Sequence, residues 1–451
     1  MVEWVLFFST LVVTMFFLTL VTLPNYFFKK HIKLFFFLGL SLRIICIFIP
    51  PIWEDDWARY LWEGNLIRNL ISPYEISPLQ FFKNNSLDPI PTEILSKINH
   101  PEWTTIYSPM VLLYFSLFTA GFSTVLLKFS YLFFETITFF HVTKKKINRS
   151  MILYWLFPVL IKEVYINLHF EAIIISMFWI FYQLLKEKKI NRSSFILGLL
   201  IQTKLIAIIY CTLLIPYLYL SGKKKKLIAM PSLFLSFLLG FLILYIVYFL
   251  MFPATKDFGF SNLQKFGDTF TFNQMYEPMW TYLNSVNLRS FPFFFQFILL
   301  FAYLYLLIPK RNRNRRFLIL CRKHHFVFYF GYFLLTLLPV YNPWYFLILI
   351  PLISISRVNS ILPWVLITIL QLSYLTNIRL NISNLFFYQI SDPILIIEAI
   401  VSLICLFFYF NQIFILLYKI SNISNFVVKE SGYGRTIPKL FGANRNRPER
   451  R

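Results

Sequence analysis

Long apolar runs separated by short clusters of lysine and arginine recur along this chain and constrain its fold more than any other feature. The runs are roughly 20 residues long, the length that a helix needs to cross a bilayer. The basic clusters lie at 29–33, 144–146, 186–189, 223–226 and 311–316. Clusters of this kind mark the cytoplasmic loops of membrane proteins. The pattern therefore predicts an all-α polytopic integral membrane protein.

The composition excludes an ordinary soluble domain. Of 451 residues, 58% are hydrophobic and only 14% are charged, whereas soluble domains carry roughly 25% charged residues. A net charge of +23 would favour a nucleic-acid partner in a soluble protein. Here the basic residues belong to the loop clusters, so we expect no nucleic-acid partner. The four cysteines have no paired spacing, which predicts neither a disulfide framework nor a metal site.

The topology follows from placing the basic clusters on the cytoplasmic side. Residues 1–52 then form a first transmembrane hairpin, which is retained because no basic segment precedes its first run. We assign residues 53–108 to an external catalytic loop, 109–418 to a transmembrane bundle with an external loop at 253–290, and 419–451 to a basic cytoplasmic tail. The whole chain is expected to contain about 11–13 transmembrane helices.

Two apolar segments have the wrong length for whole numbers of spans. Residues 109–141 are too few for two full spans, so we expect one span plus a broken or re-entrant piece. Residues 194–220 begin and end at basic clusters, so we expect two short helices that meet near Gln202, Thr203 and Lys204. Irregular backbone at membrane depth is tolerated only where protein or water surrounds it. This break therefore predicts a buried site that Lys204 lines.

The start of the first external loop carries the strongest candidate site. Three consecutive acids, Glu54, Asp55 and Asp56, directly follow an apolar run. Like charges side by side repel, so their grouping needs a reason. The functional interpretation is a catalytic mouth at the membrane surface, and the alternative is an interfacial anchor whose acids merely end a span.

A helix through this loop would be amphipathic. Four polar side chains would share one face: Asp56, Arg59, Tyr60 and Glu63. Five apolar side chains would form a stripe: Trp57, Leu61, Ile67, Leu70 and Ile71. We expect an interfacial helix whose charged face lines the catalytic mouth and whose stripe faces lipid.

Three other polar clusters carry candidate residues. Lys162 and Glu163 precede His169 and Glu171 in an external turn between two apolar runs, where polar residues are costly unless they face water or each other. Lys204 at the helix break could hold a phosphate, the alternative being a lysine that extends to the interface. The fourth cluster is Asn342-Pro343-Trp344-Tyr345. A satisfied structural histidine and an aromatic-belt tryptophan are the alternatives for His169 and Trp344.

These motifs together resemble the signature of bacterial membrane glycosyltransferases of the GT-C superfamily. The run DDWARYLWEG followed by SPYEISP resembles the family's Asp-Asp-x-x-Arg-Tyr-x-Trp-Asp-Gly and Asn-Pro-Tyr motifs. Four later segments follow in the family's order: Tyr107-Ser108-Pro109, LIKEVYINLHFEA, Thr203-Lys204-Leu205 and Asn342-Pro343-Trp344-Tyr345. The resemblance covers residues 33–350. Four positions depart from the family pattern, and they bear on the acceptor and the sugar: Glu63, Ser72, Ser108 and Leu168.

The resemblance implies a GT-C-like fold and a hexosyltransferase that uses a polyprenyl-phosphate sugar, often mannose, as donor. Carried over by position, it implies that Asp55 or Asp56 is the general base in an inverting reaction. The residues expected to bind substrate are Glu54, Arg59, Tyr60, Trp62, Glu63, Tyr107, Lys162, Glu163, His169, Glu171, Lys204, Trp344 and Tyr345. The sequence shows no spacing typical of metal ligands and indicates no particular cofactor. The resemblance leaves open whether the reaction needs a divalent metal ion.

The expected location is the cytoplasmic (inner) membrane, with the active site on the external side. The expected partners are membrane lipid, the lipid-linked donor, and a glycan, lipid or protein acceptor. A transporter or flippase of lipid-linked saccharides is the alternative. Transporters place ionisable residues near mid-membrane on discontinuous, symmetry-related helices. Here the acids gather in a long loop just after a span, which favours an enzyme.

Overall fold

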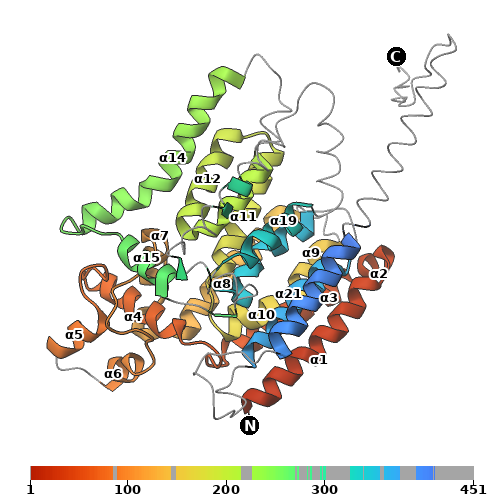
Figure 1. Cartoon of the computed structure of the whole chain (residues 1–451), viewed down its shortest axis with the longest axis horizontal. Helices are drawn as coiled ribbons and strands as arrows, with labels where there is room; N and C mark the ends of the chain where they lie inside the picture. The colour runs from red at the N-terminus through yellow and green to blue at the C-terminus, as the bar shows by residue number, and fades with distance from the viewer. Residues whose placement is uncertain are drawn as a thin grey trace, which may run out of the picture. The chain divides into compact units, whose positions relative to one another are not determined.

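The computed structural model describes residues 2–84, 89–143, 149–214, 226–269, 326–338, 340–355, 360–375 and 393–409, with short pieces between 272 and 300 and residue 411. Regular structure in these ranges is helical, apart from an isolated bridge between Phe272 and Val340 (Figure 1). This confirms the all-α prediction. The chain divides into two units, Met1–Val401 and Ser402–Arg451, and the candidate site belongs to the first.

The first 143 residues contain two long helical stretches on either side of a loop with short helices. The elements are α1 (Val2–Thr22), α2 (Asn25–Lys30), α3 (Ile32–Ile47), α4 (Asp56–Arg68), α5 (Pro78–Asn84), α6 (Pro89–Leu95), α7 (Pro109–Phe118), η1 (Ala120–Phe122) and α8 (Thr124–Thr143). Residues 109–141 contain the expected break, while the membrane span that was predicted there stays a prediction. The short piece is α7, which is 10 residues long and is separated from the 20-residue α8 by a turn at Gly121, whose φ is +63°.

The middle of the chain alternates long helices with breaks. Its elements are α9 (Arg149–Leu156), α10 (Pro158–Ile161), the π-helix η2 (Lys162–Ile166), α11 (Glu171–Lys186), α12 (Ile190–Thr203), η3 (Leu205–Tyr210), α14 (Lys226–Met251) and α15 (Phe260–Thr269). The predicted break is confirmed, because α12 ends at Thr203 and Lys204 is extended, with φ −154° and ψ 120°. Pro158 begins α10, since a proline cannot continue the preceding helix.

The last described elements are short. They are α19 (Phe326–Thr336), η4 (Pro343–Leu349), α20 (Ile350–Ile355), α21 (Leu362–Ile369), η5 (Leu370–Tyr374) and a helix over 393–409. Several sequence predictions lie outside the described residues: the clusters at 144–146, 223–225 and 311–316, most of the run at 291–309, and the tail at 419–451. The predicted number of spans stays a prediction. Within the described ranges, one helix, Met230–Met251, is long and apolar enough to cross a membrane.

One flank of α14 leaves large apolar side chains uncovered. Side chains spaced at one turn of the helix are between 49% and 73% exposed: Met230, Phe234, Leu235, Leu239, Ile246 and Leu250. Soluble monomers rarely expose a contiguous apolar patch of this kind. This flank therefore needs an apolar environment or an apolar partner.

A fully buried ion pair joins four elements of the first unit. Arg43 on α3 is bidentate to Glu135 on α8, with both N–O distances at 2.8 Å. The hydroxyls of Tyr154 and Tyr165 donate to the same carboxylate at 2.7 and 2.5 Å. Arg43 also donates to the carbonyl of Trp155 at 2.6 Å and lies over its ring. The pair therefore ties α3 and α8 to α9 and η2.

Helices α12 and α14 approach each other through two glycines. A Cβ at Gly198 would overlap the carbonyl oxygen of Phe237, and a Cβ at Gly240 would overlap that of Phe195. Small residues at such crossings let two backbones come into contact. The position of α12, and with it the break at Lys204, therefore depends on both glycines.

We predict that Gly198→Val destabilises the folded protein by about 1–3 kcal/mol, because the added side chain forces the two backbones apart. The measurement is thermal unfolding in detergent followed by circular dichroism. Leu239→Phe is the control, since it adds volume on the exposed flank of α14. Equal melting temperatures for the two variants would contradict the close crossing.

Candidate functional site

The acidic run lies at the N-terminus of α4. Asp55 is the N-cap residue and Asp56 the first residue of the helix, where the helix dipole favours negative charge. Asp55 Oδ1 accepts a hydrogen bond from Asn99 Nδ2 at 2.8 Å. Asp56 Oδ2 accepts one from the Tyr60 hydroxyl at 3.4 Å. Glu54 is half-buried and lies near enough to Tyr345 for its charge to act on that phenol.

The pKa values of both aspartates are raised. Burial raises the pKa of Asp55 to about 6, and repulsion from Asp56 adds to the shift. Burial also raises the pKa of Asp56, against the opposing charges of Arg59 and Lys204. Both carboxyls therefore titrate closer to neutrality than free aspartate does, which is the range that suits a general base.

Arg59 and Glu63 hold the loop instead of facing open space. Arg59 Nη1 lies 3.1 Å from Glu63 Oε1, and both side chains are buried. The guanidinium also donates to three backbone carbonyls in the 99–103 segment, at 2.8 to 3.3 Å. Glu63 Oε2 accepts a hydrogen bond from Thr105 Oγ1 at 2.7 Å. We expected these two residues to bind substrate, but their polar atoms bind residues 99–105.

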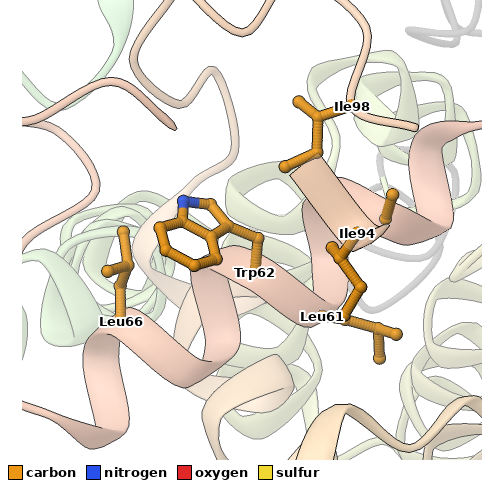
Figure 2. Close-up of a cluster of buried hydrophobic side chains, with 6 residues drawn as sticks. Leu61, Trp62, Leu66, Ile94 and Ile98 are labelled. Atoms are coloured by element: carbon orange, nitrogen blue, oxygen red, sulfur yellow. The ribbon is translucent and has the colours of Figure 1, made fainter. Parts of the chain in front are cut away.

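Trp62 lies in the apolar core of the 53–108 loop. Its ring stacks on Phe82, with centroids 4.7 Å apart, and meets Phe81 edge-on. Figure 2 shows Trp62 beside Leu66, in the cluster that Ile94 and Ile98 complete. These contacts pack its ring within the loop, while its Nε1 is buried and has no hydrogen-bond partner among the described residues. The expected contact with the sugar stays a prediction.

The apolar stripe on α4 does not face outward as expected. Leu61 and Ile67 are 1% and 2% exposed, because α6 covers the first and α7 and α14 cover the second. Leu70 lies beyond the end of the helix. The prediction of a lipid-facing stripe is therefore wrong for Leu61 and Ile67, since the loop has its own core.

Tyr60 and Tyr107 extend the acidic site toward the helices. Tyr60 stacks on Phe115 with ring centroids 4.6 Å apart, and it meets Tyr107 edge-on at 5.4 Å. The two phenols share a hydrogen bond, and each lies near the charge of Asp56. The aromatic side chains therefore fix one wall beside Asp56.

The turn between η2 and α11 presents His169 and Glu171. Leu168 has φ +70°, a backbone conformation that favours glycine. His169 stacks on Trp344, with centroids 4.1 Å apart and an angle of 17°. Within the described residues, His169 Nε2 and Glu171 Oε2 are buried and have no hydrogen-bond partner. His169 Nε2 also lies 3.8 Å from Glu163 Oε2, so this turn faces the Lys162 and Glu163 pair.

Lys162 and Glu163 form an inner network. Lys162 Nζ lies 3.2 Å from Glu163 Oε1 and 2.7 Å from Gln371 Oε1. Glu163 also accepts hydrogen bonds from Asn167 at 2.8 Å and from Tyr374 at 2.7 Å. Both charged groups were predicted to bind substrate. Their polar atoms are engaged with protein side chains, so their contacts position the turn.

Lys204 brings the clusters together. It pairs with Glu171, and its ammonium lies 4.3 Å from the ring centre of Tyr345. Its charge acts on Asp56 from across the site. Asn342 is extended, and Pro343 begins η4, which carries Trp344 and Tyr345. Five segments distant in sequence thus meet around Asp56: 54–60, 107, 169–171, 204 and 344–345.

Sequence reasoning missed Asn99, Gln371 and Tyr374. All three act through contacts between segments far apart in the chain, and none belongs to one of the four polar motifs. Among the described residues, no group of three or more His, Cys, Asp or Glu side chains is placed to hold a metal ion.

No protein-family model, curated protein or solved structure matches this chain.

We predict that Arg59→Ala destabilises the 99–105 segment by about 3–5 kcal/mol, because it leaves Glu63 buried without its cation. Limited proteolysis should then cut this segment faster than in the wild type. Glu63→Gln should have a smaller effect in the same direction. Lys97→Ala, which removes an exposed pair with Glu93 in the same loop, is the control. Equal cleavage rates for the Arg59→Ala and Lys97→Ala variants would contradict the role of Arg59 in holding the 99–105 segment.

Proposed function

We propose that this chain is a membrane-embedded glycosyltransferase of the GT-C type. It would move a hexose, with mannose as the expected sugar, from a polyprenyl-phosphate donor to a lipid-linked, glycan or protein acceptor. The observation that carries the proposal is that Asp56 and Lys204 share one polar cluster, within range of each other's charge. Glycosyl transfer of this kind needs both a base for the acceptor and a cation for the departing phosphate.

The proposed reaction is a single displacement at C1 of the sugar. Asp56 accepts the proton of the acceptor hydroxyl while the hydroxyl oxygen forms a bond to C1. The bond between C1 and the phosphate oxygen breaks on the opposite face, and polyprenyl phosphate leaves with the electron pair. The configuration at C1 is inverted, and the proton remains on Asp56 until it passes to solvent.

Asp56 is the better candidate for the base because of what surrounds it. It faces Tyr60 and Lys204, whereas Asp55 Oδ1 is occupied by Asn99. Lys204 stabilises the charge that develops on the leaving phosphate, which replaces Glu171 as its partner. His169 Nε2 lies near the same cation and offers a further polar contact.

The membrane setting has its own support. The exposed flank of α14 presents aliphatic and aromatic side chains over five turns, and hydrocarbon is the environment that such a surface fits. The basic clusters, taken as cytoplasmic, favour an external position for the 53–108 loop. A polyprenyl donor would then reach the site from the bilayer and the acceptor from the external side.

We predict that Asp56→Asn lowers transfer by about 10²–10⁴-fold, because it removes the general base. The assay uses purified protein in detergent and a panel of radiolabelled polyprenyl-phosphate sugars, with membrane extract as acceptor. Glu93→Gln is the control, since it removes an exposed acid from the same loop.

Three other outcomes are informative. An active Asp56→Asn variant beside an inactive Asp55→Asn variant would assign the base to Asp55. Full activity in both variants would contradict the carboxylate mechanism. Donor binding without turnover by the wild-type protein and by both variants would favour the transporter.

We predict that Lys204→Ala weakens inhibition by free polyprenyl phosphate about 10- to 100-fold, because it removes a charged hydrogen bond to the phosphate. The inhibition constant should recover in part in Lys204→Arg. Lys97→Ala, which removes an exposed ammonium, is the matched control. An unchanged inhibition constant in Lys204→Ala would show that this lysine does not bind the phosphate.

A further inference from the structure

Asn99 contacts Asp55, the first of the two aspartates of the candidate site. Its Nδ2 donates to Asp55 Oδ1 at 2.8 Å, and its side chain lies close enough to Asp56 to lower the pKa of that carboxyl. Asn99 belongs to the same 53–108 loop as α4 but lies well beyond the end of that helix at Arg68. One neutral amide therefore holds Asp55 and lies beside Asp56.

The backbone of Asn99 is held from the other side. Arg59 Nη2 donates to the carbonyl oxygen of Asn99 at 2.9 Å and to that of His100 at 2.8 Å. His100 has φ +47°, a turn that the same guanidinium stabilises. The ion pair with Glu63 fixes Arg59 in turn. The backbone that carries the amide is thus held by the buried pair of Arg59 and Glu63.

Adjacent carboxylates create a chemical difficulty for a general base. Two such groups repel each other, and the pair tends to retain one proton, which can sit on either member. A base that shares a proton with its neighbour is not free to accept another. Something must hold one carboxylate and leave the other to the acceptor.

We infer that Asn99 is a positioning residue that holds Asp55 in one orientation and leaves Asp56 directed at the acceptor hydroxyl. The inference rests on the proposed glycosyl transfer. An amide suits this role because it donates hydrogen bonds and carries no charge of its own. Asn99 acts through the two aspartates and not on the substrate.

The charge on the pair also depends on the groups around it. Those whose charge or phenol acts on the pair are Arg59, Tyr60 and Glu63 on α4, Tyr107 before α7, Lys204 after α12, and Tyr345 on η4. Around them, Glu171 on α11 pairs with Lys204, and Glu54 acts on Tyr345. Replacing Asn99 leaves all of them in place. A change that follows the substitution therefore reports on the amide.

The sign of the expected effect follows from the hydrogen bonds. Donation from Asn99 stabilises the ionised carboxylates, so it lowers their pKa values against the upward effect of burial. Without the amide, the pKa values rise. A base must be ionised to act, so the acidic limb of the activity profile moves to higher pH.

The test compares the wild type with Asn99→Ala and Asn99→Asp. The second variant has the same size as asparagine, which keeps the test valid if the alanine variant folds poorly. The first readout is kcat/KM against pH. The second is the pH dependence of carbodiimide labelling of the two aspartates, followed by mass spectrometry, since the reagent modifies protonated carboxyls and needs no turnover.

We expect both midpoints to rise by about one pH unit in Asn99→Ala, a tenfold change in the acid dissociation constant, and by more in Asn99→Asp, which adds a third carboxylate. Asn262→Ala is the control. It removes the hydrogen bonds between α15 and Thr104, on the same segment, without touching the aspartates. Its midpoints should match those of the wild type.

The two readouts separate the inference from the proposed function. An active wild type whose midpoints are unchanged in both Asn99 variants would overturn the role of Asn99. An inactive wild type whose labelling midpoint still rises in the variants would support the contact with the aspartates and overturn the glycosyl transfer. If the pH midpoints shift as much in Asn262→Ala as in Asn99→Ala, the effect comes from loop packing in general and the inference is overturned.

Discussion

The buried pair between Arg43 and Glu135 is the interaction on which the rest of the first unit depends. Removing either partner would leave a charge without compensation inside the protein, which typically costs about 3–5 kcal/mol. The carboxylate accepts four hydrogen bonds, two from Arg43 and one each from Tyr154 and Tyr165. Because Tyr165 belongs to η2, the pair also fixes the start of the turn that carries His169 and Glu171. A purely structural charge network thus sets the position of the polar residues that face Asp56.

The candidate site is built where helices stop. Asp56 begins α4, Glu171 begins α11, Lys204 follows the end of α12, and Tyr345 lies in the first turn of η4. A side chain at a helix end can leave the regular spiral of the backbone, so residues from separate helices can converge on one point. The breaks also release backbone groups that need hydrogen-bond partners.

The sequence predicted the breaks well because they follow from length. The prediction assumed that an apolar run between two basic clusters returns to its starting side, and the run at 194–220 is too short for two full spans. The structure has the expected break at Lys204. Contacts between distant segments left no such signal. The motif around Asp55 made Trp62 and Arg59 ligand-binding candidates. The sequence alone does not distinguish a tryptophan or arginine that binds a sugar from one that packs against its own loop, as these two do. Asn99 was missed for the same reason, because its partners are set by the folded loop.

The glycine contact between α12 and α14 has a consequence for how this protein can change over generations. In most helix pairs, two contacting residues can change together during evolution, because a larger residue on one helix is offset by a smaller one on the other. Gly198 and Gly240 are already the smallest residues, and each meets backbone, not side chain. No second substitution can make room for a first. Both glycines are therefore expected to stay fixed during evolution, although neither one touches the acidic site.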